Sequence, residues 1–79
     1  MNAPEMLRLP PSSVEAEQYL IGGLLLDNRA WDDVGAIVRE SDFYRDDHRR
    51  IWSHMAALIN AGAPADVLTV GERIEAANE

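Results

Sequence analysis

The sequence predicts an all-α fold, a small orthogonal bundle of about four helices that follows a flexible N-terminal arm. Apolar residues recur at three- and four-residue spacing in four successive segments, as expected for helices with one buried face. Polar capping residues and glycine or proline stops separate these segments by short connections. A chain of 79 residues has room for one small domain, and short connections between helices are typical of a bundle.

Composition and charge exclude several classes of function. The chain carries 14 acidic and 7 basic residues, for a net charge of −7, and it contains no cysteine and no lysine. It therefore lacks the lysine of a phosphate-binding P-loop, and it has no thiol for catalysis or metal ligation. A net negative chain is repelled by a phosphate backbone, so we expect no strong direct binding to nucleic acid.

The chain shows no pattern for membrane insertion. Its longest apolar run, residues 19–26, is far shorter than the ~20 residues that span a bilayer. We expect a soluble, cytoplasmic protein. Residues 1–11 hold three of the four prolines, which disfavour helix, so we predict an arm over 1–11 and a helical domain over 12–79.

The first predicted helix begins at Ser12 and contains a glycine doublet. Ser12 and Glu15 match a capping box, in which each side chain accepts a hydrogen bond from the other residue's backbone N–H, and Glu17 adds a second early acid that favours the helix dipole. Two interpretations of Gly22 and Gly23 stay open: a continuous helix crossed closely by a neighbour, or a kink or hairpin turn. The apolar pattern around them does not alternate, so we favour the helix and predict close helix packing at the doublet.

Local signals place three further helices. Asn28 is the predicted cap of a short helix whose apolar stripe runs over 31–38. The third helix begins at Asp46 and stops at Gly62, and the fourth follows Asp66 as its cap. The residues predicted to form the structural core are Val14, Leu20, Ile21, Leu24, Leu25, Trp31, Val34, Ile37, Phe43, His48, Ile51, Trp52, Met55, Leu58, Ile59, Val70 and Ile74.

The polar residues predict no catalytic, metal or cofactor site. Asp46, Asp47 and His48 form a D-D-H run of the kind found in metal-dependent hydrolases, but the chain has only one other histidine to complete a ligand set. We therefore interpret His48 as a hydrogen-bonded core residue and the two aspartates as acids that stabilise a helix start. By elimination, the sequence predicts a domain that binds protein.

One short segment is the candidate partner surface. Tyr44, Arg45 and Arg49 combine an aromatic ring with part of the only arginine cluster in the chain. Such a group can contact an acidic partner or a phosphate, although local ion pairs with the neighbouring aspartates are the simpler interpretation.

Four motifs, in this order, resemble the N-terminal domain of the bacterial replicative DNA helicase, the DnaB family. They are P-x-S-x-E-A-E at residues 11–17, L-x-G-x-L-L at 20–25, D-F-Y followed by H-R-x-I-W over 42–52, and G-x-P-x-D-x-x-T-V at 62–70. The resemblance covers about residues 10 to 77.

The resemblance implies a non-catalytic module of a larger machine. Proteins of this family are hexameric helicases that use ATP and Mg²⁺ in a C-terminal ATPase domain. Their N-terminal domain forms a collar with other helicase subunits and helps to dock primase and the helicase loader. This chain would then be the head of that domain, without the downstream helical hairpin, the ATPase domain or a bound cofactor. The alternative is the helicase-binding C-terminal domain of a primase, and a lower alternative is a small helical metal-dependent hydrolase.

Overall fold

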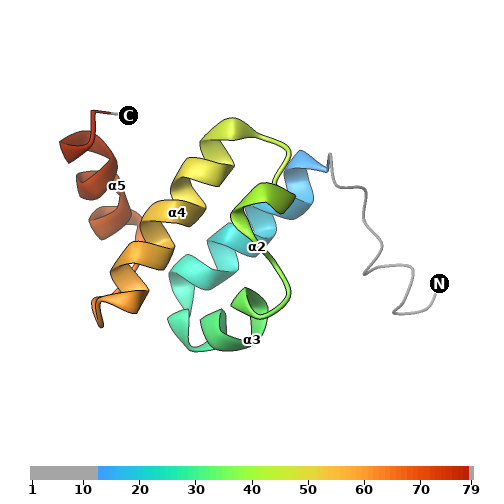
Figure 1. The fold of residues 1–79 in the computed structure, drawn as a ribbon, viewed down its shortest axis with the longest axis horizontal. Helices are drawn as coiled ribbons and strands as arrows, with labels where there is room; N and C mark the ends of the chain where they lie inside the picture. Colours follow the sequence, from blue (N-terminus) through green and yellow to red (C-terminus); the bar gives the residue numbers. More distant parts are fainter. Residues whose placement is uncertain (1–12, 79) are drawn as a thin grey trace.

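The computed structural model describes residues 13–78, which form four α-helices and two short 3₁₀ turns (Figure 1). In chain order the elements are α2 (Val14–Leu26), η1 (Asn28–Ala30), α3 (Trp31–Gly35), η2 (Glu40–Asp42), α4 (Asp46–Asn60) and α5 (Val67–Ala76). The all-α prediction is confirmed, and residues 13–78 contain no strand. Helix α4 lies between α2 and α5 and packs against both. The predicted arm, 1–11, lies outside the described residues.

The cap of α2 is Ser13, so the predicted start at Ser12 is wrong by one residue. The Ser13 hydroxyl accepts a hydrogen bond from the backbone N–H of Ala16 at 3.3 Å. Because the two serines are adjacent, the sequence pattern could not separate them. In the first turns of α2, Glu15 is exposed and Glu17 is buried.

Helix α2 runs without interruption through Gly22 and Gly23, so the turn interpretation is wrong. The predicted close packing at the doublet is also wrong, because no atom other than the adjoining backbone of α2 and the neighbouring residues in the chain lies within 4 Å of where a Cβ would stand on either glycine. The contacts with the core come instead from Ile21 and Leu24. The glycines therefore face open surface, and they contribute nothing that alanine would not.

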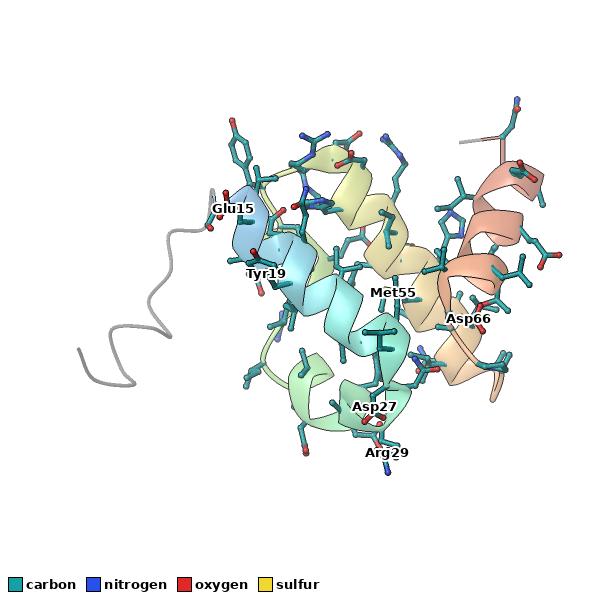
Figure 2. The ribbon with its side chains drawn as sticks, turned by 180° about the vertical axis from the view of Figure 1, so that it is seen from behind. Glu15, Tyr19, Asp27, Arg29, Met55 and Asp66 are labelled. Atoms are coloured by element: carbon teal, nitrogen blue, oxygen red, sulfur yellow. The ribbon has the colours of Figure 1, made fainter. Side chains whose placement is uncertain are left out.

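The core is centred on Met55 of α4, which is fully buried (Figure 2). Around it, Trp52 stacks at a tilt between two other rings, with centroid distances of 4.5 Å to Trp31 and 5.0 Å to Phe43. Tilted aromatic pairs at this spacing stabilise a core beyond the apolar area that they bury. They join α3, α4 and the segment that precedes α4 into one cluster.

Burial across the predicted core is uneven. Ile37 is 79% exposed, so its placement in the core is wrong: α3 ends at Gly35, and the helical register that would have buried Ile37 is lost. Val14 is only half-buried, whereas Ala65 and Glu17, which were not predicted, are buried. The predicted positions that are buried are Ile21, Leu24, Trp31, Phe43, His48, Trp52, Met55 and Val70. Those packed against them are Leu20, Leu25, Val34, Ile51, Leu58, Ile59 and Ile74.

Asn28 does not cap a helix as predicted. Asp27 caps the turn η1 instead, accepting the backbone N–H of Arg29 at 3.0 Å. This leaves the Asn28 side chain free to donate to the carbonyls of Leu24 at 2.7 Å and Ala65 at 2.8 Å, and to accept from the Ala65 N–H at 2.8 Å. One amide thus ties the end of α2 to the segment before α5.

The end of α4 and the start of α5 follow the sequence signals. Gly62 has φ of +77°, a left-handed conformation that glycine adopts without strain, just after α4. Asp66 and Thr69 form a reciprocal cap at the start of α5, each side chain accepting the other's backbone N–H at 2.8 Å. No helix of the described residues is long and apolar enough to cross a membrane.

Candidate functional site

A buried carboxylate organises the segment that carries the candidate partner residues. Glu17 projects from α2, and its Oε1 accepts hydrogen bonds from Nδ1 of His48 at 2.6 Å and from the backbone N–H of Arg45 at 3.4 Å. Its Oε2 accepts the backbone N–H of Tyr44. The side chains of Glu17 and His48 are each only 8% exposed. This carboxylate therefore joins α2, α4 and the loop 43–45 in a nearly dry environment.

The surroundings of Glu17 favour its ionised form. Burial raises the pKa of this carboxyl group, but the hydrogen bonds from Tyr44, His48 and Arg45 outweigh burial and hold the pKa below its ordinary value of 4.5. An ionised carboxylate can only accept hydrogen bonds, so Nδ1 of His48 carries the proton that lies between them. His48 is thus a structural partner of Glu17.

Arg49 holds the same loop from the opposite side. Its guanidinium donates from Nε to the carbonyl of Phe43 at 2.9 Å, and from Nη2 to the carbonyl of Tyr44 at 2.7 Å. Glu17 accepts hydrogen bonds from the N–H groups of the loop, and Arg49 donates hydrogen bonds to its carbonyls, so the loop backbone is fixed through both kinds of group. The Tyr44 side chain, by contrast, is 62% exposed. The result is an aromatic side chain presented to solvent on an ordered backbone.

The three candidate partner residues therefore lie together, and the local ion pairs with neighbouring aspartates, which the sequence favoured over a phosphate contact, are confirmed. Arg45 forms a two-point ion pair with Asp47 at 2.7 and 2.8 Å, and Arg50 pairs with Asp46. The Arg45 guanidinium lowers the pKa of Asp47 well below its usual range. These residues line a shallow depression beside Tyr44. Because its charges are already paired, this surface is suited to a protein contact more than to an isolated phosphate.

The D-D-H run does not form a metal-binding cluster. Asp46 and Asp47 face arginines, while His48 turns inward to Glu17. Within residues 13–78, no three His, Asp or Glu side chains are grouped so that they could hold a metal ion. The geometry thus offers no support to the hydrolase alternative.

A comparison with protein families decides the family. The model of the DnaB-like helicase N-terminal domain matches residues 9–79. The chain belongs to this family. A DnaB-like domain accounts for the four motifs, whose described residues fall on α2 and its cap, on the segment before α4 and its first half, and on the connection that leads into α5.

Similar proteins agree with this assignment to the DnaB-like family. The replicative DNA helicase DnaB of Buchnera aphidicola (subsp. Acyrthosiphon pisum) is 43% identical over 75 residues, covering 95% of this chain and 16% of the relative. That of Geobacillus stearothermophilus is 36% identical over 72 residues, covering 91% of this chain and 16% of the relative. The crystal structure of the N-terminal domain of DnaB helicase from Mycobacterium tuberculosis superposes with a TM-score of 0.82 at 36% identity, covering 89% of this chain and 50% of that one. This DnaB-like domain thus spans a small part of these helicases, and the matches favour the helicase interpretation over the primase alternative.

Sequence reasoning missed the central residue of the site in this DnaB-like domain. The sequence pattern predicts Glu17 only as an acid that favours the helix dipole, but it lies on the same face as Ile21 and Leu24, four and seven residues later. An acid on the apolar stripe of a helix is the signal that indicates a buried carboxylate in need of partners.

Proposed function

We propose that this chain is a non-catalytic protein-interaction and oligomerisation module of a hexameric, ATP-dependent replicative DNA helicase. The observation that carries the proposal is the family match over residues 9–79, supported by the structural likeness to a solved DnaB N-terminal domain. The site around Glu17 and Tyr44 is consistent with such a role, because it presents an exposed side chain on a fixed backbone.

The proposal extends to the intact protein. We propose that residues 12–79 are the head of the collar domain, and that a helical hairpin and an ATPase domain belong to the whole helicase. That ATPase domain binds ATP and Mg²⁺ and hydrolyses the nucleotide, whereas the present module uses no cofactor. The protein works in bacterial cytoplasm at the replication fork, where the collar joins other helicase subunits and receives primase and the helicase loader. This module makes no strong contact with nucleic acid itself.

We further propose that Tyr44 is the anchor of the primase contact. Exposed aromatic residues on ordered backbone are frequent interface hot spots, because little entropy is lost when they bind. Tyr44 is held by Glu17 and Arg49 through the backbone alone, so its ring is available to a partner. Arg45 is paired with Asp47, and Arg49 is paired with Asp46 and bound to the loop carbonyls, so the surface around Tyr44 carries little free charge and suits a partner with an apolar socket.

Calorimetric titration of the cognate primase's C-terminal domain into this chain tests the proposal. Tyr44→Ala is expected to weaken binding by at least tenfold, about 1.4 kcal/mol. The matched control is Tyr19→Ala, because Tyr19 is also exposed, at 77%, but does not lie on the loop 43–45. Unchanged affinity in Tyr44→Ala would refute its role as an anchor. The absence of any complex with the wild-type chain would refute primase docking by this module.

A further inference from the structure

A hollow between α3 and α4 shares no residue with the depression beside Tyr44. Its volume is about 410 Å³, and we call it the α3–α4 hollow. The residues of α3 that line it are Trp31, Asp32 and Gly35, and those of α4 are Trp52 and Asn60. An aromatic wall and a carboxylate thus face the same space.

The missing side chain of Gly35 leaves room over the ring of Trp31. The two residues are four positions apart in α3, so they are neighbours on one side of the helix. A Cβ on Gly35 would stand 3.6 Å from Nε1 of Trp31, 3.7 Å from Cε2 and 3.9 Å from Cδ1. Distances this similar to three consecutive ring atoms place that point above the face of the pyrrole ring, not beside its edge. A planar group of a ligand at that point would lie at van der Waals distance from the ring.

The ring of Trp31 is fixed before any ligand arrives. It is only 9% exposed, and it stacks at a tilt on Trp52 with a centroid distance of 4.5 Å. A ligand that stacks on such a ring orders no loop and fixes no side chain there, so binding carries a small entropy cost.

The charges around the α3–α4 hollow favour a cation. The exposed carboxylate of Asp32 makes no hydrogen bond or ion pair with any other residue of 13–78, whereas Asp27 and Asp47 are each paired with an arginine. Asn60 belongs to the last turn of α4, where the helix dipole is negative and where no basic residue stands. No basic residue of the described chain lines the hollow, so a cation in it has to come from another molecule.

We propose that the α3–α4 hollow binds an arginine side chain of a partner protein. A guanidinium is planar and cationic, and it stacks on aromatic rings where the ammonium of lysine cannot. Over the pyrrole ring of Trp31 it can donate hydrogen bonds to the carboxylate of Asp32 and to the amide oxygen of Asn60. A purely apolar occupant would cover the carboxylate without giving it a partner, which is unfavourable. This contact adds a second binding surface to the domain and does not depend on primase docking at Tyr44.

A nuclear magnetic resonance titration of the isotope-labelled 79-residue chain with N-acetylarginine N-methylamide tests the site. The chain has two tryptophans, so its spectrum contains two indole N–H signals. The signal of Trp31 is expected to shift to saturation with a Kd on the order of a few millimolar at low salt. The corresponding citrulline compound, in which a neutral urea replaces the guanidinium, is expected to bind about fivefold more weakly. The lysine compound is expected to bind about threefold more weakly.

Two variants with matched controls locate the contact. Gly35→Ala is expected to weaken binding about fivefold, because its methyl group occupies the stacking position over Trp31, and it also identifies the signal of that ring. Its control is Gly22→Ala, the same change on the open surface of α2. Asp32→Asn is expected to weaken binding about threefold. Its control is Asp33→Asn, which removes the same charge from a residue that does not line the hollow. Thermal unfolding verifies that all four variants are folded.

Three results would overturn the site: no response of the Trp31 signal to the arginine compound, equal binding by Gly35→Ala and its control, or equal binding by Asp32→Asn and its control. Equal affinity for the citrulline or the lysine compound would overturn the assignment to a guanidinium. Free arginine carries a carboxylate of its own, which Asp32 repels, and tighter binding of free arginine would overturn the assignment to a protein side chain.

Discussion

Replacing Asn28 with aspartate exchanges one heavy atom, the amide nitrogen for an oxygen, and leaves the shape of the side chain almost unchanged. The Asn28 amide nitrogen donates to the carbonyls of Leu24 at 2.7 Å and Ala65 at 2.8 Å, while its oxygen accepts the Ala65 N–H at 2.8 Å. In Asn28→Asp, one carboxylate oxygen still accepts that N–H, but the other faces two carbonyl oxygens. Both donated hydrogen bonds are lost and replaced by repulsion.

The expected loss follows from these contacts. A hydrogen bond contributes about 0.5–1.5 kcal/mol net, and a buried acceptor left without a donor costs about 1–3 kcal/mol. The Ala65 carbonyl belongs to a residue that is 1% exposed, so the larger figure applies there. We expect Asn28→Asp to lower the free energy of unfolding by about 2–4 kcal/mol at pH 7. This is a large share of the roughly 4–12 kcal/mol expected for a chain of this size.

Urea unfolding followed by the fluorescence of Trp31 and Trp52 measures this loss. The control is Asn60→Asp, the same chemical change at an exposed position in the last turn of α4, for which the helix dipole predicts a loss below about 1 kcal/mol. The carbonyls raise the pKa of the new carboxyl group in the folded state. The penalty should therefore be present at neutral pH and shrink as pH falls through that pKa, where the protonated acid donates again. A wild-type urea midpoint for Asn28→Asp at pH 7 would show that the amide does not hold α2 to the segment before α5.

Two further changes test other parts of the structure. Because the pKa of Glu17 is lower in the folded state, its ionised carboxylate stabilises the fold above the ordinary pKa of 4.5. This contribution to stability is lost as pH falls through the folded-state pKa. Glu17→Gln should thus lower the free energy of unfolding by about 1–3 kcal/mol at pH 7 and weaken the dependence of stability on acid pH. Urea unfolding at a series of pH values measures both effects. An unchanged dependence on acid pH would count against the buried pair with His48. Gly23→Ala should raise the melting temperature by several degrees, because alanine favours the helix by about 0.5–1 kcal/mol and its methyl group has free space there. A lower melting temperature would indicate that another helix crosses closely at the doublet.

The sequence by itself determined the helices. The apolar stripe of α4, the left-handed Gly62 after it and the Asp66 cap of α5 each depend on contacts within about four residues, and such contacts are visible in any short window. The same local rules placed Met55 and Trp52 on the stripe that proved to be the centre of the core. The ordered motifs also indicated the family, because they record spacing along the chain and require no knowledge of contacts.

The tertiary structure alone decided how the polar groups are used and which apolar groups stay outside. Glu17 finds its partners 27 to 31 residues away in sequence, and Asn28 finds Ala65 at a separation of 37. The exposure of Ile37, of Leu26 and of the glycine doublet depends on where neighbouring helices end and cross. A polar side chain is satisfied by whichever group the fold brings near, and an apolar face is covered only if another element reaches it. Neither the partner of a polar side chain nor the cover of an apolar face can be predicted from the residues within one helical turn of it.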